Sequence, residues 1–347
     1  MNIYMLGNIF DMQTGMYIME SFTEHCSNVV ATDVRKMISE NSREKTQQLV
    51  KEELDTLGFS PDIILVLKGL ELNIDTLDYI KEKYPKAKLV NWFFDKYLLD
   101  KPIWEDEKMF EFIKIFDYFF CSLKGVADKL QEVGITNAVY LDEACHPDAH
   151  GEVYVNHFQS EKYGSDITFI GSLGLELQHS TRLEILKRVV DEGFRTKIWG
   201  VNVNPAIIPP QIREVYQGNP LINIDHSKAV QSSIINIGID QDATVDMGHS
   251  ARVYRVMCAG GCYVSEATKG LDKMFKSNKL GEMPDGSEEI VLFNDLNDMV
   301  ELIDFLLEND EIARQIGLNG QKKVLAEHTF VDRTKEMIEI IKKGEKK

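Results

Sequence analysis

The sequence has no long apolar run and no targeting segment. Its longest apolar stretches, such as residues 63–67 and 118–121, have the length of a strand, far short of the ~20 residues that a membrane span requires. The first residues, MNIYMLG, carry no basic segment and no small-residue cleavage site, so they predict a first strand and not a signal peptide. We therefore expect a cytoplasmic protein without a membrane span.

Basic residues are few relative to acidic ones. Lys and Arg total 39 against 56 Asp and Glu, which gives a net charge of −17. A surface of this charge repels a polyanion, so non-specific nucleic-acid binding is not expected. A locally basic pocket for a phosphorylated ligand remains compatible with this balance.

Cysteines are also scarce and unpaired in the sequence. The five of them show no C-x-x-C spacing, and Cys258 and Cys262 lack a second pair nearby. This pattern predicts reduced thiols and neither a disulfide framework nor a zinc site. The sequence HPDAH at 146–150 invites a metal interpretation, but it lacks the further ligands of a closed site, and no metal is expected.

Strands alternate with helices along most of the chain. This alternation is typical of βαβ units and a parallel sheet. The polar segment 147–165 interrupts it and predicts a linker between an N-terminal domain, residues 1–146, and a second domain, residues 166–328. Strands are expected at residues 3–6, 29–32, 63–67, 88–94, 116–121 and 138–141, then at 166–170, 196–199, 221–224, 234–239, 262–265 and 290–293.

The strand at 234–239 is followed by a polar loop and then a helix. Ser250 is a favourable N-cap, and Arg252 and Arg255 share one face of that helix near its start. Backbone N–H groups and arginines at the carboxyl edge of a parallel sheet suit a diphosphate. The candidate donor-binding residues here are Ser250, Arg252, Tyr254, Arg255, Gly260 and Gly261. The alternative is a surface helix with solvated arginines and a glycine cap.

A second candidate loop follows the strand at 166–170. Gly171 and Ser172 are small enough to let a phosphate or sugar approach closely, although the loop is not G-x-G-x-x-G. Arg182 lies in the first turn of the next helix, where a cation opposes the helix dipole. It either faces the diphosphate or is solvated.

Several blocks resemble the spore-maturation-protein-like glycosyltransferases, a GT-B family. The blocks are FIGS at 169–172 with Arg182, INIG at 235–238, SARVYRVMCAGG at 250–261, KGL at 269–271 with Met274 and Phe275, and EHTF at 327–330 with Arg333. Weaker matches are PDII at 61–64, NWFFD at 91–95, FDY at 116–118, LDEA at 141–144 and HPD at 146–148. The resemblance implies two Rossmann-like, doubly wound parallel-sheet domains with a cleft between them. It also implies that residues 329–347 form a helix crossing back to the first domain.

The sequence departs from the family at one informative position. Many relatives carry a Glu-x7-Glu pattern that contacts the donor ribose, whereas this chain has Met247 and Arg255 there. A guanidinium cannot accept the hydroxyl hydrogen bonds that a carboxylate accepts. Glu266 is the nearest carboxylate that would serve instead, or it is a solvated loop residue.

The resemblance implies that the first domain binds the acceptor. In the loop after the first strand, Asn8, Asp11 and Thr14 offer hydrogen bonds and Phe10 offers a ring for stacking, or the loop is a folded turn with Thr14 as helix cap. Asp95 follows the strand at 88–94 and is a candidate catalytic base, or a structural carboxylate. Glu266 is the second candidate catalytic residue.

The leading hypothesis is a glycosyltransferase. It would use a nucleoside-diphosphate sugar as co-substrate and no cofactor. The acceptor would be a hydroxyl of a glycan, protein or small molecule. By resemblance the transfer would be retaining, and the lack of a convincing D-x-D loop favours a metal-independent reaction. The alternatives are a sugar-nucleotide epimerase of the same fold and a catalytically silent nucleotide-sugar-binding protein.

Overall fold

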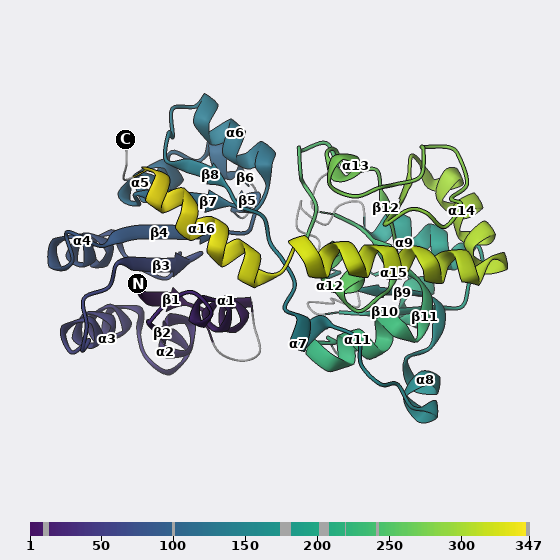
Figure 1. Cartoon of the computed structure of the whole chain (residues 1–347), viewed down its shortest axis with the longest axis horizontal. Coiled ribbons are helices and arrows are strands. Elements are labelled where there is room, and N and C mark those ends of the chain that lie inside the picture. Colours follow the sequence, from purple (N-terminus) through teal and green to yellow (C-terminus); the bar gives the residue numbers. More distant parts are fainter. Residues whose placement is uncertain are drawn as a thin grey trace. The chain divides into compact units, whose positions relative to one another are not determined.

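The computed structural model describes residues 1–9, 14–98, 101–173, 182–200, 208–218, 220–240 and 243–344. The chain divides into two compact units (Figure 1). Unit 1 comprises Met1–Asp142 and Phe330–Lys347, and unit 2 comprises Glu143–Thr329. Phe10 and Asp11, two of the expected acceptor-binding residues, lie outside the described residues. No helix in the described ranges has the length and apolarity needed to cross a bilayer.

Unit 1 is built on a six-stranded sheet in the order β2-β1-β3-β4-β7-β8, with every neighbouring pair parallel. The strand β3 (Ile63–Leu67) is apolar at every position and buried throughout, as expected of a strand covered on both faces. The other strands are β1 (Asn2–Gly7), β2 (Asn28–Asp33), β4 (Lys88–Phe93), β7 (Tyr118–Cys121) and β8 (Ala138–Tyr140); β5 (Tyr97–Leu98) and β6 (Lys101–Pro102) form a separate antiparallel pair.

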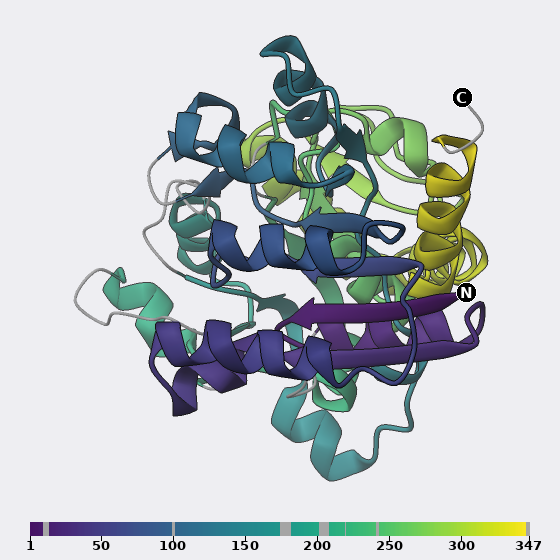
Figure 2. The ribbon, with the colours of Figure 1, turned by 90° about the vertical axis from the view of Figure 1, so that its left-hand side faces the viewer.

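Helices connect these parallel strands. In Figure 2 this unit faces the viewer. They are α1 (Thr14–Thr23), α2 (Val34–Glu40), α3 (Arg43–Asp55), α4 (Ile74–Lys83), the short 3₁₀ helix η1 (Ile103–Glu105), α5 (Glu107–Ile115) and α6 (Lys124–Glu132). The last helix of the chain, α16 (Phe330–Gly344), also packs in unit 1. Its first residue, Phe330, is fully buried between the rings of Tyr17 and Trp92, and Thr334 donates to the Ser21 carbonyl.

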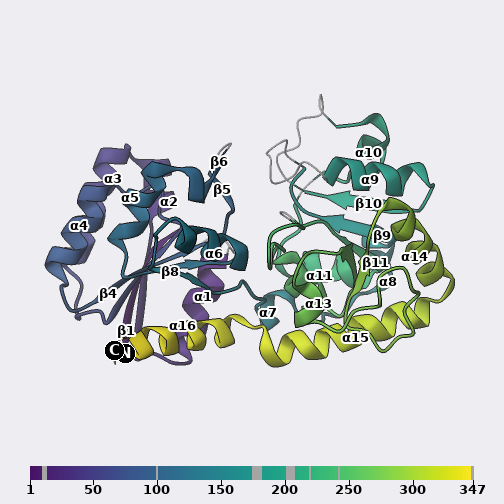
Figure 3. The ribbon, with the colours of Figure 1, turned by 90° about the horizontal axis from the view of Figure 1, so that it is seen from above.

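Unit 2 repeats the architecture with a five-stranded parallel sheet in the order β10-β9-β11-β12-β13. Its strands are β9 (Ser165–Ile170), β10 (Thr196–Trp199), β11 (Ser233–Gly238), β12 (Cys262–Glu266) and β13 (Val291–Phe293). Its helices are α7 (Pro147–His150), α8 (His157–Tyr163), α9 (Arg182–Asp191), α10 (Pro210–Val215), α11 (Asn223–Gln231), α12 (Arg252–Cys258), α13 (Leu271–Met274), α14 (Leu296–Glu308) and α15 (Asp310–Glu327), the long helix along one side in Figure 3.

The fold class predicted from the sequence is confirmed, with two local differences. The strand expected at 221–224 does not form, because Asn223 has a left-handed backbone and already begins α11. Ile222 and Ile224 are 44% and 49% exposed, so this apolar run has no sheet to join. The polar segment 147–165 contains two short helices, α7 and α8, that its composition did not indicate.

Candidate functional site

The sheet of unit 2 changes winding direction between β9 and β11. The chain moves from β9 outward to β10 and then returns to β11 on the other side. Ligands of open α/β sheets bind outside the carboxyl ends of the strands at such a point. A cavity of about 310 Å³ lies there, lined by Glu143, Ile170, Gly171, Ser172, Gly200, Pro220, Leu221, His226, Ser250, Ala251, Arg252 and Arg255.

Arg252 fixes the wall of this cavity. Its Nε donates to the Ile170 carbonyl and its Nη1 to the Ile239 carbonyl, both at 2.8 Å. The guanidinium also lies over the Phe169 ring, with Cζ 4.8 Å from the ring centroid. Arg252 therefore ties the ends of β9 and β11 together and places a positive charge at the cavity.

The sequence-based prediction that Ser250 caps the following helix is wrong. The seven-residue helix α12 begins at Arg252, with Ala251 at the cap position. The Ser250 N–H donates to the Asp240 carboxylate at 3.1 Å, and the buried Asp240 also accepts from the Thr268 hydroxyl at 2.9 Å. Asp240 thus shapes the loop, and the positive charge at the cavity comes mainly from Arg252 and Arg255.

Two buried histidines lie near Arg255. His226 lines the cavity and is 6% exposed, and its ring packs edge-on against His150 with centroids 6.2 Å apart. Burial and the neighbouring charges of Arg255 and Arg252 lower the pKa of His226 to about 3. Burial and Arg255 also hold the pKa of His150 well below its ordinary value. Both imidazoles are therefore neutral at neutral pH.

His226 has no hydrogen-bond partner within the described residues, and its Nδ1 is buried. Its ring nitrogens are the kind of group that a ligand in the cavity would satisfy. Glu143 is half-buried on the cavity wall and supplies a carboxylate. Neither residue stands out in the sequence, because each is distant from the arginines along the chain and only the strand order brings them together.

Two glycines at this edge of the sheet allow the loops after β9 and β10 to approach closely. A Cβ on Gly200 would overlap the carbonyl oxygen of Gly171, and a Cβ on Gly171 would overlap the Arg252 guanidinium. Arg182 is buried and donates from Nη1 to the Ser172 carbonyl at 2.9 Å. Arg182 therefore holds the loop after β9 and is not itself among the residues lining the cavity.

Four other predicted residues lie away from this cavity. Tyr254 is fully buried, where its hydroxyl contacts His249 Nε2 at 2.9 Å. Gly260 and Gly261 follow the other end of α12 and line a different cavity. Glu266 ends β12 at the carboxyl edge but is absent from the lining.

The expected acceptor-side residues belong to unit 1. Asn8 directly follows β1, and Thr14 is the first residue of α1. Asp95, just after β4, pairs with Lys68 at the end of β3, with Nζ 2.5 Å from Oδ2. No sequence motif marks Lys68, whose left-handed backbone turns the chain after the strand.

Within the residues that the structure describes, no group of three or more His, Cys, Asp or Glu side chains is placed to hold a metal ion.

Comparison with known proteins places this geometry in a family context. Residues 181–339 match the family described as glycosyl transferase-like. No curated protein sequence matches the chain significantly.

Solved structures share the fold along the whole chain. Sucrose-phosphate synthase from Thermosynechococcus elongatus aligns with a TM-score of 0.64 at 10% identity, covering 99% of this chain and 98% of that one. HepE from Anabaena, in complex with UDP and glucose, aligns with a TM-score of 0.65 at 9% identity, covering 99% of this chain and 100% of HepE. An α,α-trehalose-phosphate synthase from Burkholderia xenovorans, in complex with glucose-6-phosphate, aligns with a TM-score of 0.62 at 9% identity. The alignment covers 97% of this chain and 99% of the synthase.

At these identities the structural likeness establishes the fold alone. The chain has the two-domain fold of the GT-B glycosyltransferases, and its residues 181–339, just under half of the chain, match the glycosyl transferase-like family.

Proposed function

We propose that the protein transfers a sugar from a nucleoside-diphosphate sugar to a hydroxyl acceptor, and that the unit 2 cavity binds the donor. The observation that carries this proposal is the pair Arg252 and Arg255 on the wall of a cavity at the switch point of a parallel sheet. A guanidinium presents paired N–H donors that match the oxygens of a diphosphate. The UDP-glucose complex of HepE, a protein of the same fold, supports a nucleotide sugar as donor.

Different parts of the nucleotide sugar would contact different lining residues, according to their charge. Arg255 would bind the diphosphate, beside the positive wall that Arg252 forms. Glu143 and the neutral His226 would form hydrogen bonds with hydroxyls of the nucleotide sugar, in place of the missing Glu-x7-Glu carboxylates.

The transfer would be retaining and metal-independent. The bond between the sugar C1 and the β-phosphate oxygen breaks, a bond from C1 to the acceptor oxygen forms, and the acceptor hydroxyl gives up its proton. The two arginines would stabilise the negative charge on the departing diphosphate, which a bound cation does in other enzymes. On the acceptor side, Asn8, Thr14 and Asp95 stay the candidates in unit 1, with Asp95 as the base.

Calorimetry with UDP, ADP, GDP and dTDP tests the donor site. We expect at least one nucleotide to bind, and Arg255→Ala to weaken that binding about 10- to 100-fold, because a lost charge-assisted hydrogen bond costs about 1.5–3 kcal/mol. Arg188→Ala is the matched control, since Arg188 lies on α9 in an ion pair with Glu192. Equal affinity in both variants would contradict the assignment of the site.

A turnover assay with the matching nucleotide sugars separates the three functions. Free nucleoside diphosphate together with a glycosylated product is the expected outcome. An altered sugar nucleotide would indicate an epimerase instead, and binding without turnover would indicate a silent binding protein.

A further inference from the structure

A second cavity of about 350 Å³ lies at the opposite edge of the same sheet. Ser233 and Cys262, the first residues of β11 and β12, line it. Gly260 and Gly261 close one side, where a Cβ on Gly261 would overlap Val230 and Asn236. This amino-edge cavity is therefore separate from the candidate donor cavity, which lies beyond the strands' carboxyl ends.

The lining of the amino-edge cavity combines aliphatic side chains, among them Ile234 and Leu318, with polar ones, and it is not basic. It carries the carboxylates of Glu152 and Asp310, the single guanidinium of Arg314, and the amides of Gln231 and Gln321. Two acidic groups against one cation disfavour a phosphate or other anion, and a purely apolar ligand would leave these charged and amide groups without partners. Alternating donors and acceptors of this kind match an uncharged, polyhydroxylated molecule.

The two amides are oriented by the protein itself. Gln231 accepts from the Val153 N–H through Oε1 at 2.9 Å, and Gln321 donates through Nε2 to the Cys258 carbonyl at 3.1 Å. Their remaining atoms, the Gln231 Nε2 and the Gln321 Oε1, make no further hydrogen bond among the described residues. One donor and one acceptor are thus held ready for a ligand.

An aromatic ring extends the cavity. Glu152 and Gln231 also line an adjoining groove together with Tyr154, whose side chain is 86% exposed. A ring this exposed contributes little to packing and is accessible to a ligand in the groove. Tyrosine combines an apolar face, on which a sugar ring stacks, with a hydroxyl that bonds to water or ligand.

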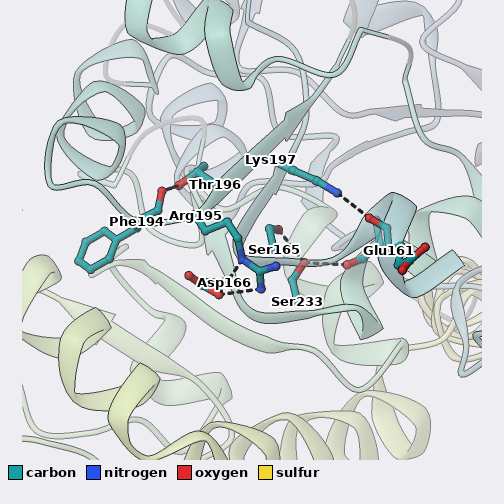
Figure 4. A network of polar contacts seen from close by, with 9 residues as sticks. Glu161, Ser165, Asp166, Phe194, Arg195, Thr196, Lys197 and Ser233 are labelled. Carbon is teal, nitrogen blue, oxygen red and sulfur yellow. Dashed lines mark hydrogen bonds and ion pairs between the residues drawn. The ribbon is translucent and has the colours of Figure 1, made fainter. Parts of the chain in front are cut away.

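The segment bearing Tyr154 is anchored at both ends. On one side Val153 bonds to Gln231, and on the other Asn156 forms a capping box with Gln159 at the start of α8. The far end of α8 is fixed by Lys197, which donates to the carbonyls of Glu161 and Lys162 at 3.2 and 2.7 Å. Figure 4 shows Lys197 pointing toward Glu161.

The same network reaches the cavity wall. The hydroxyls of Ser165 and Ser233 are hydrogen-bonded at 3.0 Å, and Arg195 pairs with Asp166 at 2.9 Å (Figure 4). A preorganised surface loses less entropy when a ligand binds.

We propose that unit 2 carries a carbohydrate-binding site at this edge, in which an uncharged oligosaccharide stacks on Tyr154 and hydrogen-bonds to Glu152, Gln231 and Gln321. The site requires no donor nucleotide and shares no lining residue with the donor cavity. It would hold a glycan chain on unit 2 independently of the transfer reaction.

The test uses the full-length protein on an array of immobilised uncharged oligosaccharides, followed by calorimetry with the oligosaccharide that binds. Tyr154→Ala and Glu152→Gln alter exposed side chains, so both variants should fold. Phe158→Ala is the matched control, because Phe158 is 79% exposed on α8 but lines neither the cavity nor the groove.

We expect the wild type to bind an uncharged oligosaccharide, Tyr154→Ala to weaken the affinity at least tenfold, and Phe158→Ala to leave it unchanged. UDP should not compete. The proposal is overturned if no oligosaccharide binds, if Tyr154→Ala and Glu152→Gln both retain full affinity, or if UDP displaces the glycan. Nucleotide binding measured on the same variants reports on the proposed function separately.

Discussion

Arg252 and Arg255 lie three positions apart on one short helix, yet the fold gives them different environments. Two donor nitrogens of Arg252 bond to carbonyls at the ends of β9 and β11, so this side chain fastens the cavity wall. Arg255 lies near the two neutral histidines, and their burial together with its charge lowers their pKa values. Replacing Arg252 should therefore damage the loop structure as well as ligand binding, which is why Arg255 is the better probe of the donor site.

The neutral state of His226 makes the stability of unit 2 depend on pH. Its pKa is about 3 in the folded protein against an ordinary 6.5, so between these values the unfolded chain binds more protons than the folded one. The stabilisation is complete above pH 6.5 and is lost as the pH falls toward 3. From pH 8 to pH 5 we expect unit 2 to lose about 2 kcal/mol in its free energy of unfolding through this residue alone.

Denaturant unfolding of the wild type and His226→Gln at both pH values measures this loss. The variant should lose correspondingly less stability on acidification, whereas His157→Gln should behave as the wild type, because His157 is exposed. An identical pH dependence in His226→Gln would show that His226 is not the group responsible.

At the scale of elements, the loops after β9 and β10 are held together by two glycines. Because a Cβ on Gly200 would overlap the backbone oxygen of Gly171, no rotamer change can relieve the clash. We expect Gly200→Ala to cost about 1–3 kcal/mol, the usual range for overpacking. The measurement is thermal unfolding of the variant, with Gly58→Ala as control, since a Cβ on Gly58 meets no atom within 4 Å. Full stability of Gly200→Ala would mean that the loops are not in contact as described.

Most sheet strands were predictable because buried parallel strands are short, continuous apolar runs. Ile63–Leu67 is such a run and matches the sequence-based range at both ends. Thr196–Trp199 also matches at both ends, although Lys197 interrupts its apolar character. The failure at 221–224 has the same origin, since three apolar residues around Asn223 cannot show whether a neighbouring strand exists to pair with them. Helices α7 and α8 were missed because both are short and polar, and capping rather than an apolar stripe defines α8.

The candidate site was predictable only in part. Gly171, Ser172, Ser250, Arg252 and Arg255 do line one cavity, because each follows or nearly follows the end of a strand. Gly260 and Gly261 were placed with them by sequence proximity, yet they lie at the other end of α12. Glu143, Gly200 and His226 join the cavity through the strand order, which one sequence does not reveal. Donor binding by any of these residues stays a prediction.

For the whole molecule, the distribution of charge matters more than its sum. The chain carries a net charge of −17, but the unit 2 cavity presents two arginines against the single carboxylate of Glu143. A local positive potential in an acidic protein selects a small anion that fits the cavity over an extended polyanion. In the amino-edge cavity of the same unit acidic side chains outnumber basic ones, so it should not bind that anion.

The central claim is that a nucleoside diphosphate binds at the carboxyl edge of the unit 2 sheet. Hydrogen–deuterium exchange of the full chain, with and without the diphosphate found by calorimetry, tests it most directly because it localises the ligand on the sequence. The account predicts slower exchange around residues 170–173 and 250–256, and loss of that effect in Arg255→Ala. Slower exchange confined to the amino-edge cavity or to unit 1, or no change in any segment at saturating nucleotide, would contradict it.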